Sequence, residues 1–289
     1  MSSPELLESV KLSDGRSLSF ARFGDPSGKP VFYFHGFPGS RLEPQSNHDA
    51  FLKAGIQLLA LDRPGIGHST RKNKRKLLDW PDDVVEIAKI LKLEKFSILG
   101  VSGGGPYALA CARAIPGYLN KVTVACGLGP IDAPNATSGM MLSNRVLFRY
   151  GKFFPPVLHL STFLMVRQLS SKPAKGLKKF VEGLPEADRL VLSKTDAQDF
   201  VAASAVEGVR QGSGPLLEEI GIYSRSWGFK LEDLNVPVSL FQGEVDIDVP
   251  ASMARHQASL IPDCEINLYP NDGHFSLLVN HIDEIIASL

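Results

Sequence analysis

Short apolar runs alternate with amphipathic segments along much of the chain. Four of these runs have the length of buried strands: 31–34, 56–61, 96–99 and 121–125. Helical spacing fills the intervals between them, at 43–54, 80–91 and 104–114. Strand signals return near 238 and 265, and the chain closes with an amphipathic helix over 275–289. Parallel strands covered on both faces are almost continuously apolar, so the pattern predicts a doubly wound, mostly parallel α/β sheet.

Two stretches depart from this alternation. Residues 10–12 and 18–21 flank the turn 13–16 and predict an N-terminal antiparallel hairpin. From about 129 to 235 the strand signals vanish, helical periodicity is scattered, and prolines interrupt it repeatedly. This second stretch predicts a separate, largely helical region between the fourth and fifth parallel strands.

The pentapeptide Gly100-Val101-Ser102-Gly103-Gly104 lies between an apolar strand and a helix rich in small residues. A Cβ at Gly100 or Gly104 would crowd so tight a turn. The turn presents the Ser102 hydroxyl beyond the sheet and leaves the Gly103 N–H free at a helix N-terminus. These features are typical of a nucleophilic serine. A serine that only caps the following helix would have the same local sequence. Whether a base, an acid and a second oxyanion donor are present elsewhere in the chain therefore decides between the two interpretations.

A base and an acid follow later in the chain. His274 comes directly after a strand near 266–269 and the turn 270–273, and an imidazole with a pKa of about 6.5 suits a general base near neutrality. We expect that pKa to stay within about one unit of 6.5, because burial lowers it and a neighbouring carboxylate raises it. The strand near 238 ends in the loop 242–250, which offers a carboxylate to orient the imidazole.

The segment His35-Gly36-Phe37-Pro38-Gly39 follows the apolar strand 31–34. In this position the backbone N–H of Phe37 can join that of Gly103 to form an oxyanion hole. His35 is a second histidine near the predicted site. We interpret it as a residue that forms structural hydrogen bonds beneath the loop rather than as the catalytic base.

Together these motifs resemble those of α/β-hydrolase-fold serine hydrolases with a core domain and a helical lid. The matching segments follow the family's order: 35–39, 62–69, 100–104, 243–250 and 273–274. The chain order Ser, Asp, His is the order expected of this fold. In the family's acid loop an aspartate usually stands three residues before a Val-Pro pair, which selects Asp246 and not Asp248. Some members supply the acid after the preceding strand, so Asp132 stays an alternative.

The resemblance also implies how the chain is divided. Residues 1–128 and 236–289 would form the α/β-hydrolase core, and 129–235 the lid over the site. Five apolar side chains of the lid region either line a substrate pocket or anchor the lid to the core: Phe148, Phe153, Phe154, Leu158 and Phe163. The loop 35–39 is similar to that of epoxide hydrolases, which use an aspartate nucleophile. Ser102 at that position favours acyl transfer instead.

Composition fits a compact enzyme, since 289 residues of which 44% are hydrophobic can build a large core. The formal net charge is zero and indicates neither nucleic-acid binding nor attachment to an anionic membrane. The basic run 71–76 is interpreted as a solvated loop. No run reaches the roughly 20 apolar residues of a membrane span. The N-terminus lacks the pattern of a signal peptide, so we expect a cytoplasmic protein.

The three cysteines lie in apolar contexts without metal-ligand spacing. We expect each of them to be a reduced, buried small hydrophobe: Cys111, Cys126 and Cys264.

The sequence therefore predicts a serine hydrolase that cleaves an ester, thioester or lactone of a small, partly apolar substrate. Ser102, His274 and Asp246 would form the catalytic triad, with the Phe37 and Gly103 amides as the oxyanion hole. No organic cofactor or metal is implied, and we expect a monomer or homodimer. Two alternatives stay open: a triad-bearing ligand receptor with little turnover, and a peptidase similar to proline iminopeptidases. Those peptidases typically have a glycine where this chain has Phe37.

Overall fold

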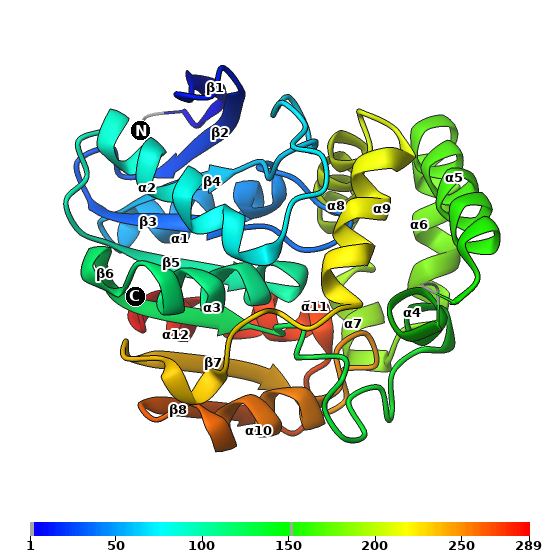
Figure 1. Ribbon diagram of the computed structural model, residues 1–289. Helices are drawn as coiled ribbons and strands as arrows, with labels where there is room; N and C mark the ends of the chain where they lie inside the picture. The colour runs from blue at the N-terminus through cyan, green and yellow to red at the C-terminus, as the bar shows by residue number, and fades with distance from the viewer. Residues whose placement is uncertain (1–2, 151–152) are drawn as a thin grey trace.

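The computed structural model describes residues 3–150 and 153–289 (Figure 1). Within these residues eight strands form one sheet in the order β1-β2-β4-β3-β5-β6-β7-β8. Their bounds are β1 (Glu5–Lys11), β2 (Ser17–Gly24), β3 (Lys29–Phe34), β4 (Ile56–Leu61), β5 (Phe96–Val101), β6 (Leu119–Ala125), β7 (Val238–Gly243) and β8 (Cys264–Tyr269). Strand β2 pairs antiparallel with both β1 and β4, and the other neighbours are parallel. The predicted hairpin and mostly parallel sheet are confirmed.

Helices cover both faces of the sheet because the strands bury side chains on both sides. In β3, Phe32 and Phe34 face one core cluster, whereas Val31 and Tyr33 face the other. The first cluster is completed by α2 (Trp80–Ile90), α3 (Gly105–Ala114) and α10 (Ala251–Leu260). The second is completed by α1 (His48–Lys53), α11 (His274–Asn280) and α12 (Ile282–Ala287).

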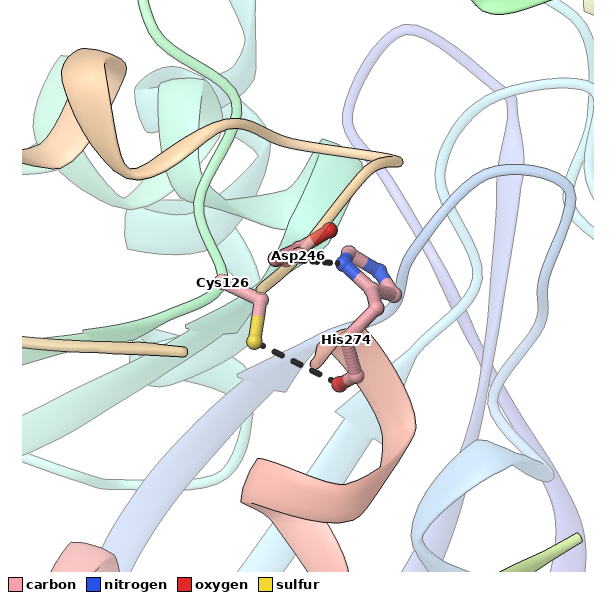
Figure 2. A group of neighbouring side chains, drawn as sticks. All are labelled: Cys126, Asp246 and His274. Carbon is pink, nitrogen blue, oxygen red and sulfur yellow. Dashed lines mark hydrogen bonds and ion pairs between the residues drawn. The ribbon is translucent and has the colours of Figure 1, made fainter. Parts of the chain in front are cut away.

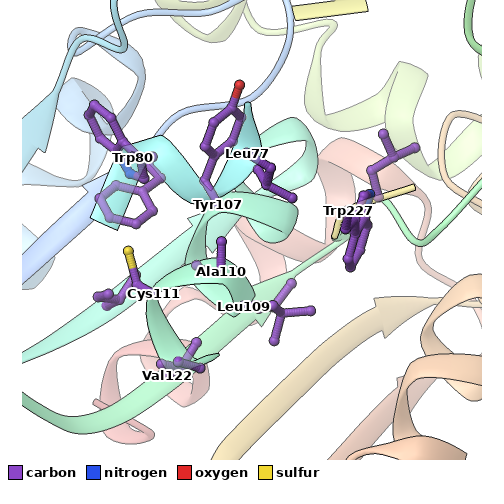
Figure 3. Close-up of a cluster of buried hydrophobic side chains, with 14 of the residues drawn as sticks. Leu77, Trp80, Tyr107, Leu109, Ala110, Cys111, Val122 and Trp227 are labelled. Carbon is purple, nitrogen blue, oxygen red and sulfur yellow. The ribbon is translucent and has the colours of Figure 1, made fainter. Parts of the chain in front are cut away.

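The larger cluster is centred on aromatic side chains, several of which appear in Figure 3. The Trp80 ring meets the rings of Phe34 and Tyr107 edge to face, with centroid distances of 5.4 and 6.1 Å. Edge-to-face contacts between buried rings add stability beyond the apolar area that they remove from water. This packing holds α2 and α3 against the strands that position the candidate site.

Two of the predicted helices are interrupted in the structure. The predicted helix 43–54 consists of the 3₁₀ turn η1 (Glu43–Asn47) followed by α1, and the predicted C-terminal helix divides into α11 and α12. The division falls at His281, whose backbone (φ −121°, ψ 21°) is not helical. The remaining short turns are η2 (Leu77–Asp79), η3 (Ser102–Gly104), η4 (Pro116–Tyr118) and η7 (Leu231–Asp233).

The described residues between β6 and β7 contain helices and loops but no strand, and their helices before η7 form one group. They are α4 (Leu142–Arg145), the π-helical turn η5 (Val146–Tyr150), α5 (Pro155–Ser171), α6 (Pro173–Glu182), α7 (Glu186–Val191), α8 (Thr195–Gly208) and α9 (Ser213–Tyr223). In Figure 1 this group lies beyond one edge of the core, with α5 and α6 on its outermost side. The parallel strands direct their carboxyl ends toward it, which is where sites form in open α/β sheets.

Candidate active site

Ser102 occupies the turn between β5 and α3. Its backbone has a positive φ of 52°. Residues other than glycine rarely adopt this conformation, and those that do are often found at functional sites. A Cβ on Gly100 would lie 2.8 Å from the Ala108 Cβ, and one on Gly104 would lie 2.0 Å from the Phe34 carbonyl oxygen. The sequence predicts this crowding correctly. The small residues allow β5, β3 and α3 to approach closely around Ser102.

Asp246 and His274 meet after β7 and β8 (Figure 2). His274 Nδ1 lies 2.8 Å from Asp246 Oδ2. The other Asp246 oxygen accepts hydrogen bonds from the backbone N–H groups of Asp248 and Val249, each at 2.8 Å. The Gln242 side-chain amide donates a further bond to Asp246 Oδ2 at 3.1 Å. These bonds fix the carboxylate and leave the opposite ring nitrogen of His274 available.

The two rival acids occupy other environments. The Asp248 carboxylate accepts a hydrogen bond from the Asn144 side-chain amide at 2.9 Å, and burial raises its pKa to about 6. Asp132 is exposed. The carboxylate that is bonded to the His274 imidazole is therefore that of Asp246.

The His274 imidazole is surrounded by acidic groups. Burial alone would lower its pKa, but the carboxylates of Asp246, Asp248 and Asp188 outweigh burial and raise that pKa to about 9. This differs from the sequence expectation of a value within about one unit of 6.5. The expectation weighed burial against a single carboxylate, whereas the fold brings three of them near the ring.

The loop after β3 meets the Ser102 turn. A Cβ built on Gly103 would lie 3.0 Å from the Phe37 Cβ, and one built on Gly36 would lie 3.3 Å from the Ser102 Cβ. Phe37, Ser102 and Gly103 line the same cavity. The two backbone segments named as oxyanion donors are therefore neighbours.

His35 lies beneath this loop, fully buried. Its Nδ1–H can donate to the Gly36 carbonyl oxygen at 2.9 Å. Burial, reinforced by the nearby Arg63 guanidinium, holds its pKa well below the usual range, so the ring is neutral. The contacts fit the structural interpretation given to His35.

A buried ionic network on the side of α9 supports the loop after β3 and the turn at Ser102. Glu219 accepts hydrogen bonds from Arg63 at 3.0 Å and from Arg75. Arg63 also donates to the Gly36 carbonyl at 3.1 Å, and the Tyr223 hydroxyl lies 3.0 Å from the Gly103 carbonyl. Although burial opposes ionisation, the two guanidinium groups lower the pKa of Glu219 and keep it charged.

The interpretation of run 71–76 as a solvated loop is wrong for Arg75, which is buried in this network. Its partner Glu219 stands 144 residues away, so the run itself gave no sign of the pairing. The sequence did contain a sign that Glu219 is buried, because this acidic residue stands next to the apolar stretch 220–223. A buried charge requires a partner.

Asp188 is a further residue that the sequence analysis missed. This fully buried carboxylate of α7 accepts hydrogen bonds from three consecutive backbone N–H groups, those of His274, Phe275 and Ser276, at 2.8–3.0 Å. Gly273 permits the approach, since a Cβ there would lie 2.3 Å from the carboxylate. Asp188 lies in the first turn of α7. Acidic residues are common at the start of a helix, so no local sequence pattern distinguishes this aspartate from a solvated one.

A cavity of about 1310 Å³ connects these parts, and both Ser102 and His274 line it. Three of the five apolar side chains considered for a pocket contribute to its wall: Phe148, Phe154 and Leu158. Phe153 and Phe163 are instead more than half exposed, and the described lining of the cavity does not include them. Most of the wall is apolar, so the cavity suits an apolar group next to Ser102.

Cys126 follows β6 and lies beside Asp246 and His274 (Figure 2). One donor atom from each of these three residues falls within 4.8 Å of the others. The group fits a resident metal poorly, because His274 and Asp246 are bonded to each other and burial raises the pKa of the Cys126 thiol well above its usual range. Cys111 is buried as expected, whereas Cys264 is only half-buried, a correction to its prediction.

The chain belongs to the alpha/beta hydrolase fold family, whose sequence profile matches residues 29–281. A non-heme chloroperoxidase from Streptomyces lividans is 26% identical over 269 residues, which are 92% of each protein. A proline iminopeptidase from Arabidopsis thaliana is 31% identical over 117 residues, or 39% of this chain and 30% of that protein. The esterase RhEst1 from Rhodococcus sp. ECU1013 has the same fold, with a TM-score of 0.69 at 20% identity over 98% and 99% of the two chains.

Proposed function

We propose that this protein is a serine hydrolase that cleaves a carboxylic ester, thioester or lactone with a partly apolar acyl group. The observation that carries the proposal is the convergence of Ser102 and the His274–Asp246 pair on one apolar cavity. A serine that only capped α3 would need neither a positive φ nor a histidine in the same cavity. The esterase assignment goes beyond the family, which includes several chemistries.

In the proposed first step Ser102 Oγ attacks the substrate carbonyl carbon. His274 Nε2 accepts the serine proton, and Asp246 stabilises the imidazolium that forms. The negative charge moves to the carbonyl oxygen, where the N–H groups of Phe37 and Gly103 donate hydrogen bonds to it. His274 then returns the proton to the departing alcohol or thiol as the tetrahedral intermediate collapses to an acyl-enzyme.

Hydrolysis of the acyl-enzyme repeats these roles with water. His274 removes a proton from the water molecule, whose oxygen attacks the acyl carbon. Collapse of the second intermediate releases the acid and returns the proton to Ser102. Leu158 and Phe148 provide apolar surface for the acyl group during both steps.

The experiment that tests the proposal is a panel of p-nitrophenyl esters graded by acyl length, with lactones and proline p-nitroanilide. We expect sustained turnover of the esters and a kcat/KM that increases with acyl length until the cavity is filled. A burst without sustained turnover would favour the ligand receptor. Preference for the anilide would favour the peptidase, the activity named for the Arabidopsis relative.

The pH profile provides a second test. His274 must be neutral to accept the Ser102 proton, so activity is lost as pH falls through its pKa. Because that pKa is raised to about 9, we expect the acid limb of kcat/KM to have a midpoint well above 6.5 and to fall about tenfold per pH unit below it. A chelator or added zinc should leave the midpoint unchanged. A midpoint near 4 would identify a carboxylate as the base.

Asp188 is proposed as a positioning residue for His274. In Asp188→Asn the amide N–H₂ would oppose one of the backbone N–H donors, and the negative charge near the imidazole would be lost. We expect kcat to fall on the order of tenfold to a hundredfold from displacement of the ring, with the acid limb shifted to lower pH. Steady-state kinetics across pH would measure both effects.

The matched control is Glu186→Gln, which removes an exposed acidic group from the same helix. It should leave both kcat and the acid limb unchanged. If Asp188→Asn lowered activity without moving the acid limb, its role would be structural support alone.

Several sequence predictions stay predictions. They are the division at 128/129 and 235/236, the lid role of the middle segment, the cytoplasmic location, the small-molecule partner without nucleic acid, and the monomeric or homodimeric state.

A further inference from the structure

Helix α5 is apolar on two opposite sides. Its inward side contributes Leu158, Met165 and Leu169 to the cavity. Its outward side carries Leu160 and Phe163, which are 60% and 52% exposed and are not part of the described cavity lining. Val157 and Leu164 lie between the two sides, because they are 62% and 52% exposed and also line the cavity. A group of exposed large apolar side chains marks a surface that protein or lipid normally covers. In Figure 1, however, α5 lies on the outermost side of the molecule, away from the sheet.

The same part of the chain is strongly basic. Residues 133–181 contain eight lysines and arginines but no aspartate or glutamate, although the whole chain has a formal net charge of zero. Arg167 is exposed one helical turn after Phe163, and α6, which packs against α5, exposes three lysines: Lys175, Lys178 and Lys179. Exposed apolar side chains flanked by lysine and arginine are typical of helices that lie in the interface of an anionic membrane.

The exposed apolar side chains continue into the cavity. Six large apolar residues are both well exposed and part of its described lining, five of them in the segment between β6 and β7 and one in α11: Leu142, Val146, Phe154, Val157, Leu164 and Val279. The same cavity is lined by Ser102 and His274. An apolar molecule on the α5 surface therefore has an apolar path toward the candidate nucleophile.

We propose that the outward side of α5 and the lysines of α6, together the α5–α6 face, dock onto an anionic lipid surface. The apolar side chains enter the acyl-chain boundary, and the basic groups contact the headgroups. Within the described residues no helix is long and apolar enough to cross a bilayer, and docking at the interface needs none. A second copy of this chain suits the face less well, because a symmetric contact would oppose two basic segments.

The test uses vesicles of dialkyl-ether phosphatidylglycerol, a lipid that contains no carboxylic ester bond. Binding is thereby separated from the proposed hydrolysis, so either proposal can fail alone. We expect the purified protein to float with these vesicles, to bind dialkyl-ether phosphatidylcholine vesicles at least tenfold more weakly, and to lose most of its binding at 0.5 M NaCl.

Two double variants locate the binding surface. Lys178→Gln/Lys179→Gln should lower the partition coefficient roughly thirtyfold, at about fivefold for each charge removed. Leu160→Gln/Phe163→Gln should lower it more than tenfold, because both side chains lose their transfer to an apolar medium. Circular dichroism and turnover of a short, soluble ester report whether each variant is folded.

The matched controls lie on other surfaces. Lys53→Gln/Lys89→Gln removes two exposed lysines from α1 and α2, and Leu7→Gln removes an exposed leucine from β1. Both should bind vesicles as the unaltered protein does. Failure to float with anionic vesicles, or equal loss of binding in the controls, would overturn the proposal. A dimer in sedimentation that Leu160→Gln/Phe163→Gln dissociates would identify a second copy as the occupant instead.

Discussion

Replacing Ser102 with alanine is expected to lower kcat on ester substrates by about 10⁶ while the protein stays folded. In the proposed mechanism Ser102 is the nucleophile, and the remaining groups cannot replace it. Alanine retains the Cβ of serine, so the positive φ of 52° costs about as much in the variant as in the original chain. Pre-steady-state and steady-state kinetics with a p-nitrophenyl ester would measure the loss, and thermal unfolding would check the fold.

The matched control is Ser143→Ala, which removes a hydroxyl from the lining of the same cavity but from α4 rather than from the turn at Ser102. Its activity should stay close to that of the unaltered protein. Residual activity of Ser102→Ala within tenfold of the original would exclude Ser102 as the nucleophile and would leave it as a helix cap.

Asp246→Asn is expected to lower kcat by about 10⁴. The carboxylate accepts the His274 Nδ1–H at 2.8 Å, which leaves Nε2 free to accept the serine proton. An asparagine can donate to Nδ1 and thereby favours the tautomer with its proton on Nε2, which is useless as a base. Loss of the charge should also move the acid limb to lower pH, since Asp246 is the strongest of the groups that raise the pKa of His274.

Two further variants distinguish the acids. Asp248→Asn should be mild by comparison, because its carboxylate is bonded to Asn144 and not to the imidazole. Asp132→Asn should be close to silent, as an exposed side chain. If Asp132→Asn were damaging and Asp246→Asn almost silent, the assignment of the acid would be wrong.

Local sequence patterns predicted the elements that carry the candidate site. Ser102 could be placed between a strand and a helix because glycine spacing and apolar runs are properties of neighbouring residues. The positions of Asp246 and His274 after late strands followed in the same way. Their pairing across 28 residues was inferred from the resemblance to a family rather than from the residues themselves, and the 2.8 Å contact is a property of the fold.

The surroundings of the site could not be predicted in this way. Asp188 reaches the backbone of His274 from 86 residues away, and Glu219 meets Arg63 from 156 residues away. No local pattern reveals the partner of either residue, since each acquires that partner only when distant elements pack together. The raised pKa of His274 has the same origin, because it depends on carboxylates from the loop after β7 and from α7.

The sequence by itself thus determined where the strands lie along the chain, the tight turn at Ser102 and the helical content of 129–235, since periodicity and turn chemistry act over a few residues. Tertiary structure alone decided which side chains are exposed. Leu160 and Phe163 fit a buried helix by composition, yet the fold leaves them 60% and 52% exposed beside a basic helix. The formal net charge of zero gave no indication of this basic surface, because positive and negative charges on separate surfaces cancel in a sum over the chain.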